Sequence, residues 1–97
     1  MQFGVCGDPG LATVEAIAGY DYAEWAVEAL LKPRQSEDEF HAVCMTLSDA
    51  ALPYPVANCF VPGDLKITGL QADEALLRDY VTTVMDRAER LGIRIIV

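Results

Sequence analysis

The stretch DEALLRDYVTTVMDRAERLGIRIIV, residues 73–97, contains the two kinds of element that decide the fold. Apolar residues recur every three or four positions, which predicts a helix with one apolar face formed by Leu77, Val81, Val84, Ala88 and Leu91. Gly92 supplies the residue type that ends helices in a left-handed conformation, and residues 93–97 then form a short apolar strand. A helix followed at once by a strand is typical of an α/β protein.

The rest of the chain repeats this alternation of strand and helix. Three further strands are predicted from short apolar or aromatic runs at residues 2–6, 20–27 and 54–61. Two further helices are predicted from apolar residues at helical spacing in residues 11–18 and 36–51. Ser36 and Glu39 have the spacing of a capping box at the start of the second of these helices. The order β-α-β-α-β-α-β predicts parallel strands joined by right-handed crossovers. Both a flavodoxin-like open sheet and part of a (β/α)8 barrel satisfy it.

The charge balance limits the partners of the chain. Its 97 residues are 53% hydrophobic and include 7 basic against 15 acidic residues, which gives a net charge of −8. That charge repels nucleic-acid phosphates and anionic lipid, so binding to nucleic acids or to membrane surfaces is not expected. No apolar run reaches the roughly 20 residues that span a bilayer.

The cysteines indicate a reducing compartment. Cys6, Cys44 and Cys59 are an odd number, lie far apart, and include no CxxC pair. We interpret them as reduced thiols of a cytoplasmic protein that act as small buried side chains, and not as a disulfide frame or a zinc site.

The aromatic stretch GYDYAEWAV, residues 19–27, raises the question of which side chains face a site. Read as a strand, it places Tyr22, Glu24 and Ala26 on one side and Trp25 on the other. We expect Trp25 to pack under the helices and Asp21 to act as a structural partner of a turn.

Three motifs resemble one known family. CGDPG (residues 6–10), GYDYAEW (19–25) and VANCFVPGDLKITG (56–69) occur in this order and spacing in the chain. They resemble the sugar phosphate isomerase/epimerase superfamily of xylose isomerase-like (β/α)8 barrels, which also includes the endonuclease IV relatives. The closing AERLGIRIIV (88–97) resembles the passage from the third helix to the fourth strand of such proteins.

The resemblance implies a fold and a reaction. Residues 1–97 are expected to form a single partial TIM-barrel domain of about four parallel strands and three helices, the N-terminal portion of a barrel that takes about 250 residues when complete. The complete enzyme would act on a small polyhydroxylated carbonyl substrate, a sugar or sugar phosphate, by metal-assisted proton transfer. The family's divalent-metal ligands come from strands five to eight, so no metal is assigned to a residue here. The 97-residue chain alone is expected to be inactive.

Four residues are candidates for substrate contacts, because active sites of such barrels lie at the carboxyl ends of the strands. The resemblance implies that Glu24 faces the substrate and that Asn58 and Phe60 point toward the pocket; Cys6 ends the first strand at the same mouth. Asn58 would bind a sugar hydroxyl, and Phe60 would pack on a sugar C–H face. Ordinary strand packing is the alternative for each residue. No catalytic residue is assigned.

A second interpretation is a small α/β binding or self-assembly module without catalytic activity. The apolar strand at residues 93–97 would leave an exposed edge, and such an edge invites pairing with another copy of the chain. An independent flavodoxin-like domain that binds a phosphoryl ligand is a third interpretation.

Overall fold

The computed structural model of this chain describes residues 1–9, 16 and 18–97. Its elements, in chain order, are β1 (Gly4–Cys6), β2 (Tyr22–Ala26), α2 (Val27–Leu30), α3 (Glu37–Ser48), β3 (Val56–Asn58), α4 (Glu74–Leu91) and β4 (Ile95–Ile96). The helix predicted at residues 11–18 falls mostly outside the described residues. The alternation of strands and helices along the remainder of the chain is confirmed.

The four strands form one parallel sheet in the order β1-β2-β3-β4. Neighbours in the sheet are therefore neighbours in the chain. This order does not match the flavodoxin-like arrangement, which places the first strand between the second and the third. The register of the sheet pairs Cys6 with Glu24, Glu24 with Val56, and Val56 with Ile95.

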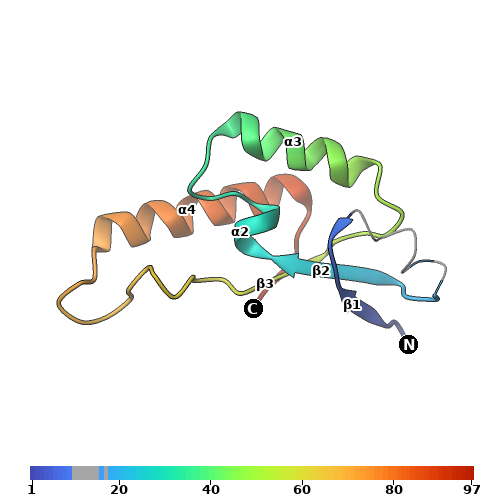
Figure 1. Cartoon of the computed structure of the whole chain (residues 1–97), viewed down its shortest axis with the longest axis horizontal. Coiled ribbons are helices and arrows are strands. Elements are labelled where there is room, and N and C mark those ends of the chain that lie inside the picture. Colours follow the sequence, from blue (N-terminus) through green and yellow to red (C-terminus); the bar gives the residue numbers. More distant parts are fainter. Residues whose placement is uncertain (10–15, 17) are drawn as a thin grey trace.

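Helices α2, α3 and α4 lie on one side of the sheet, above it in Figure 1. The buried core between the two layers includes Ala23 and Ala57 from the strands, together with Phe40 from α3 and Val84 from α4. Trp25 is half-buried against the same cluster, as predicted from the alternation of β2. The opposite face of the sheet therefore carries no helix among the described residues.

The strands are shorter than the sequence predicts. The run 54–61 pairs only at Val56–Asn58, because Cys59 adopts a left-handed backbone conformation with φ 53° and ends the alternation. The run 20–27 pairs at Tyr22–Ala26, since Val27 already begins α2. No helix among the described residues is long and apolar enough to cross a membrane.

The helix ends follow the predicted capping chemistry. The Ser36 hydroxyl accepts a hydrogen bond from the Glu39 amide at 3.3 Å, which fixes the start of α3. Asp73 accepts from the Leu76 amide at 3.1 Å at the start of α4. Gly92 ends α4 with φ 74°, a conformation that costs glycine least.

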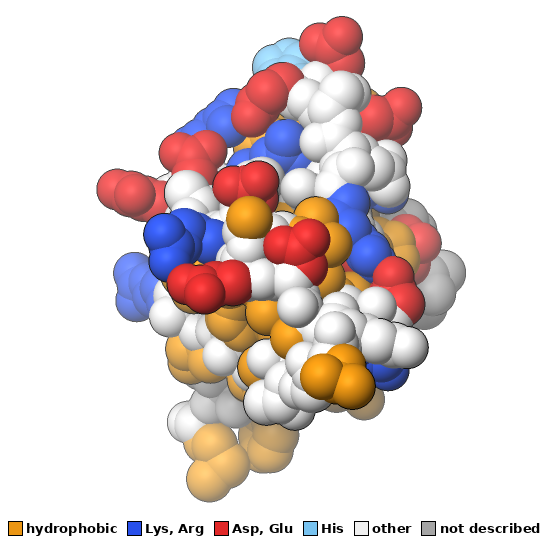
Figure 2. Space-filling model, turned by 90° about the vertical axis from the view of Figure 1, so that its left-hand side faces the viewer, with side chains coloured by type: hydrophobic (Ala, Val, Ile, Leu, Met, Phe, Trp, Pro, Cys, Tyr) orange, Lys and Arg blue, Asp and Glu red, His pale blue; other side chains and the backbone are white. Residues whose placement is uncertain are grey.

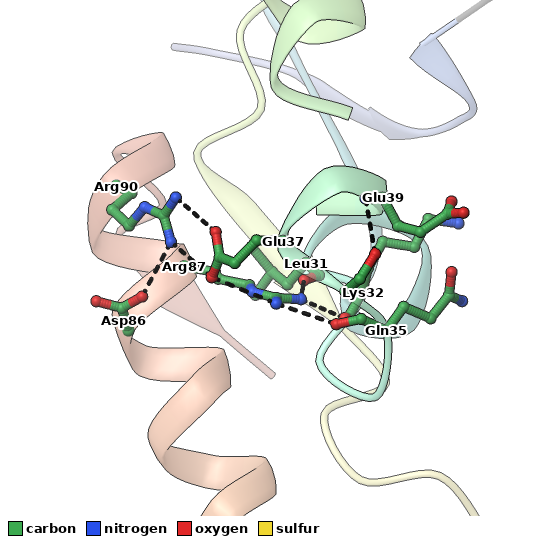
Figure 3. A network of polar contacts seen from close by, with 9 residues as sticks. Leu31, Lys32, Gln35, Glu37, Glu39, Asp86, Arg87 and Arg90 are labelled. Atoms are coloured by element: carbon green, nitrogen blue, oxygen red, sulfur yellow. Dashed lines mark hydrogen bonds and ion pairs between the residues drawn. The ribbon is translucent and has the colours of Figure 1, made fainter. Parts of the chain in front are cut away.

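Arg87 of α4 is a buried charge that the apolar stripe did not predict, with 4% of its surface exposed. Its guanidinium donates to the carbonyl oxygens of Leu31 at 2.9 Å, of Lys32, and of Gln35 at 3.1 Å (Figure 3). It also lies over the Phe40 ring, 5.0 Å from the ring centroid. Arg87 therefore joins the connection between α2 and α3 to α4.

A second arginine extends this network on the surface. Arg90 donates to the two carboxylate oxygens of Glu37 at 3.1 and 2.9 Å and pairs with Asp86 at 3.2 Å (Figure 3). The hydrogen bond from Arg90 holds the pKa of Glu37 below its usual value. Glu74 pairs with Arg78 one turn further along the exposed side of α4, at 2.8 Å.

The prediction that all three cysteines are buried is wrong for two of them. Cys6 and Cys59 are exposed, and Cys44 is of intermediate exposure. Cys6 is exposed because it lies on the helix-free face of the sheet, and Cys59 because the chain leaves β3 at that residue.

Candidate functional site

Three of the four candidate residues come together on the helix-free face of the sheet, toward the carboxyl ends of its strands. The Asn58 side-chain amide at the end of β3 donates to the Cys6 sulfur at the end of β1, at 3.4 Å. Glu24 of β2 lies between these strands, in register with Cys6. The structure thus places Cys6, Glu24 and Asn58 in one cluster, although 52 residues separate the first from the last.

The strand pattern explains this convergence. Parallel strands bring their carboxyl ends to the same edge of a sheet, and alternate residues face the same side. Asn58 is in register with Ala26, whose side chain is a single methyl group. Because that methyl group leaves space above β2, the Asn58 side chain can reach across it toward Cys6.

The three clustered side chains leave most of their hydrogen-bonding groups available to a ligand, because the bond from Asn58 to Cys6 is the one that joins them. Glu24 is half-buried, and its side chain forms no hydrogen bond or ion pair with the described residues. A carboxylate accepts hydrogen bonds from hydroxyl groups, while the second amide hydrogen and the oxygen of Asn58 add a donor and an acceptor. This set suits a small ligand with several hydroxyl groups.

Phe60 does not join the cluster, so its expected position beside Asn58 is wrong. Its ring stacks on Tyr80 of α4, with ring centroids 6.3 Å apart and an interplanar angle of 26°. The left-handed conformation of Cys59 reverses the alternation that would have kept Phe60 on the face of Asn58. Phe60 thus packs against the core on the helix side.

Tyr80, on which the Phe60 ring stacks, is a buried side chain of α4 with 3% of its surface exposed. Its hydroxyl donates to the Phe60 carbonyl oxygen at 2.5 Å. Burial, assisted by the nearby negative charge of Glu28, raises the pKa of Tyr80 to about 12. Tyr80 therefore anchors the chain directly after β3 to the helix layer.

Asp21 has the structural role expected of it. Its carboxylate accepts a hydrogen bond from the Phe3 amide at 2.8 Å, and its own amide donates to the Phe3 carbonyl at 2.7 Å. These two bonds join the beginnings of β1 and β2. Asp21 lies at the amino-terminal end of the sheet, away from the cluster.

An ionic cluster that the sequence did not indicate ties the segment after β3 to α2. Arg34 pairs with Glu28 at 2.5 Å and with Asp64 at 2.7 Å. The hydrogen bond from Arg34 keeps the pKa of Asp64 below its usual value. Because Arg34 and Asp64 are 30 residues apart, no local spacing could have revealed the pair.

A cavity of about 410 Å³ lies at the opposite end of the sheet. Its lining includes residues that precede the strands, among them Gln2, Pro55 and Arg94, and it contains none of the three clustered residues. In α/β proteins with parallel sheets, ligands bind outside the carboxyl ends of the strands. We therefore take Cys6, Glu24 and Asn58 as the candidate site.

The clustered residues do not fit a divalent cation. Hard cations such as Mg²⁺ require several oxygen ligands, and the cluster provides one carboxylate and one amide oxygen. The described residues contain no group of three or more His, Cys, Asp or Glu side chains that could hold a metal ion. We derive no reaction step through a metal at these residues.

Comparisons with family models, curated proteins and solved structures found no match to this chain. A function is therefore proposed from the sequence motifs and from the geometry of the sheet and the cluster.

Proposed function

We propose that the chain is a sector of a sugar phosphate isomerase/epimerase-like (β/α)8 barrel. The proposal rests on the motif resemblance and on two features of the fold. The strands follow chain order in one parallel sheet, and the described helices α2, α3 and α4 lie on one face of it. In a closed barrel the helices surround the sheet in the same way.

In this proposal the helix-free face is the barrel interior, and the clustered residues lie at its substrate mouth. The observation that carries this assignment is the contact of Asn58 with Cys6 across β2, next to Glu24. These groups would bind the hydroxyls of a small polyhydroxylated carbonyl compound, a sugar or a sugar phosphate. Glu24 would act as a binding contact rather than as the catalyst.

The reaction class proposed for the complete barrel is metal-assisted proton transfer next to a carbonyl, with carboxylates as bases. The catalytic base and the metal ligands would lie on strands outside residues 1–97. The chain of 97 residues is therefore proposed to bind substrate weakly and to catalyse nothing. Metal-dependent isomerase activity in a verified preparation of this chain would contradict that part of the proposal.

Binding is tested by amide NMR spectroscopy. D-fructose and dihydroxyacetone phosphate are titrated into the labelled chain, with sorbitol as a polyhydroxylated control that lacks the carbonyl. We expect the carbonyl compounds to shift the side-chain amide signal of Asn58 and the backbone signals of Cys6 and Glu24 more than sorbitol does.

Two variants and one matched control make this test specific. Glu24→Gln and Asn58→Ala are expected to weaken the response several-fold, because each removes one hydrogen-bonding group of the cluster. Asp38→Asn removes a carboxylate charge from the exposed side of α3 and should leave the response unchanged. Equal responses in all four proteins would show that the cluster is not the binding site.

A further inference from the structure

A second cavity, of about 260 Å³, lies between the first half of α4 and the segments that follow α2 and β3. Its walls all come from described elements of the helix side, and it contains none of the clustered residues Cys6, Glu24 and Asn58. Figure 2 views the molecule from the end at which α4 begins. In the middle of that view, hydrophobic side chains are visible between acidic and basic ones.

Part of the cavity wall is apolar and fixed by the core. Pro33, Leu65 and Tyr80 are buried residues of the lining, and Leu76 adds an exposed apolar side chain. The Tyr80 hydroxyl donates its one hydrogen to the Phe60 carbonyl, so Tyr80 contributes mainly its ring to the cavity. This wall suits a short hydrocarbon group, which gains free energy by leaving water.

Two polar side chains of α4 line the same cavity. Asp79 and Thr83 lie one turn apart, and neither side chain forms a hydrogen bond or an ion pair with the described residues. Arg34, the third polar residue of the lining, is already paired with Glu28 at 2.5 Å and with Asp64 at 2.7 Å. A carboxylate and a hydroxyl oxygen are therefore the groups available to a ligand.

The charges around the cavity favour a cation. Three carboxylates lie on or next to its lining, those of Glu28, Asp64 and Asp79. They outnumber the two neighbouring cations, Arg34 and Lys66. The whole chain, with a net charge of −8, adds to the attraction of positive ligands.

The start of α4 does not reverse this preference. A helix N-terminus attracts anions through its free amides and its dipole. The Asp73 carboxylate already accepts a hydrogen bond from the Leu76 amide at 3.1 Å, and Glu74 places a second acid in the first turn. The positive end of α4 is thus balanced by acidic residues of its own.

We propose that this cavity binds a small alkylammonium compound. The hydrocarbon part packs against Pro33, Leu65 and the Tyr80 ring, and the ammonium group donates to the Asp79 carboxylate and the Thr83 hydroxyl. An ammonium group has three donors and no acceptor, which matches two oxygen acceptors beside an apolar wall. The cavity volume of about 260 Å³ lies just below the roughly 300–1,000 Å³ of pockets for drug-sized ligands, so the compound is small.

Three probes with the same carbon chain test the preference for charge. Butylamine (a cation at neutral pH), 1-butanol and butanoate are titrated separately into the labelled chain and followed by amide NMR spectroscopy. We expect butylamine to shift the backbone signals of Leu65, Asp79 and Thr83, with 1-butanol binding several-fold more weakly and butanoate not at all. Equal affinities for butylamine and 1-butanol, or a preference for butanoate, would overturn the proposal.

Two variants and a matched control locate the site. Asp79→Asn keeps the shape of the side chain and removes its charge, so the affinity for butylamine should fall several-fold, to that of 1-butanol. Glu89→Gln removes a carboxylate from an exposed position of the same helix outside the cavity and should leave the affinity unchanged. Thr83→Leu places a larger apolar side chain in the cavity and should abolish binding of both probes, with unchanged helix content by circular dichroism. Equal losses in Asp79→Asn and Glu89→Gln would show that only the overall charge attracts the amine, and would refute the site.

This inference goes beyond the proposed function and uses none of its residues. The response to fructose is measured at Asn58 and the response to butylamine at Asp79, in separate signals of the same spectrum. Failure of one binding test therefore leaves the other intact.

Discussion

Replacing Arg87 by methionine is expected to be the most damaging single change that keeps side-chain length. The substitution removes the guanidinium that donates to the carbonyls of Leu31, Lys32 and Gln35 (Figure 3). Leu31 is fully buried, so its carbonyl oxygen has no water to replace Arg87. The methionine side chain still fills most of the space against Phe40, and therefore the lost hydrogen bonds dominate the effect.

The size of the effect follows from the groups left without partners. A buried polar group that loses its partner costs about 1–3 kcal/mol. The carbonyls of Lys32 and Gln35 belong to less buried residues and regain water, so they add less than Leu31 does. We expect the free energy of unfolding to fall by about 3 kcal/mol, from a total of roughly 5–15 kcal/mol for a domain of this size. The corresponding decrease in Tm is about 15 °C.

Urea unfolding followed by circular dichroism measures this loss. Arg90→Met is the matched control, because Arg90 has the same chemistry and lies over the same Phe40 ring at 4.9 Å but has 46% of its side chain exposed. Exposed ion pairs contribute little to stability, so the control should lose much less than Arg87→Met. Arg87→Lys should fall between the two, since an ammonium group cannot reach three carbonyls with the same geometry. Equal losses for Arg87→Met and Arg90→Met would refute the argument that buried carbonyls decide the cost.

Three further predictions concern packing and pH. Gly4→Ala should destabilise the fold by about 1–3 kcal/mol, because an added Cβ would lie 2.2 Å from two atoms of the Tyr22 ring. Gly63→Ala is the control in the same urea titration and should be nearly neutral, because its added Cβ would meet nothing within 4 Å. If the Tyr22 ring causes the loss, Gly4→Ala should cost much less stability when it is introduced into a Tyr22→Ala chain. Tyr80 has a pKa raised to about 12, so its contribution to stability is complete below the unfolded value near 10 and is lost as pH rises from there toward 12. The Tyr80→Phe variant should therefore lose less stability than the natural chain over that interval, and parallel curves would contradict the assignment. Glu37 has a lowered pKa, so its contribution is present above the unfolded value near 4.3 and disappears as pH falls below it. Glu37→Gln should be less stable than the natural chain near neutral pH, with a difference that vanishes in acid; a constant difference would mean that the ion pair with Arg90 does not matter.

Sequence patterns that span only a few residues predicted the helix ends and the faces of β2, because capping and side-chain alternation depend on neighbouring residues. The bounds of α4 follow from apolar spacing, the Asp73 cap and Gly92, all of which act within a few residues. The start of α3 at Ser36 follows from a hydroxyl and an amide three residues apart. The alternation of β2 placed Trp25 and Glu24 on opposite faces correctly, because side-chain direction in a strand is a property of the backbone alone.

The candidate site could be predicted only in part. Cys6, Glu24 and Asn58 were expected at one mouth from the resemblance, and parallel pairing in register brings them together. Phe60 was misplaced because the prediction extended β3 through Cys59, whose left-handed backbone has no clear signal in a non-glycine residue. The exposure of Cys6 was missed because apolar composition does not say which face of a sheet lacks helices.

For this protein, the order of amino acids by itself determined where α3 begins, where α4 begins and ends, which residues of β2 share a face, and that strands and helices alternate. Each of these depends on hydrogen bonds and side-chain periods that span a few residues. The strand order, the helix-free face, the buried Arg87 and the pair of Arg34 with Asp64 were decided only in the tertiary structure. The contacts of Arg87 with the α2–α3 connection and the pair of Arg34 with Asp64 join residues 30 or more positions apart, and strand pairing joins residues 18 or more positions apart. Their free energy depends on burial that no short segment can provide by itself.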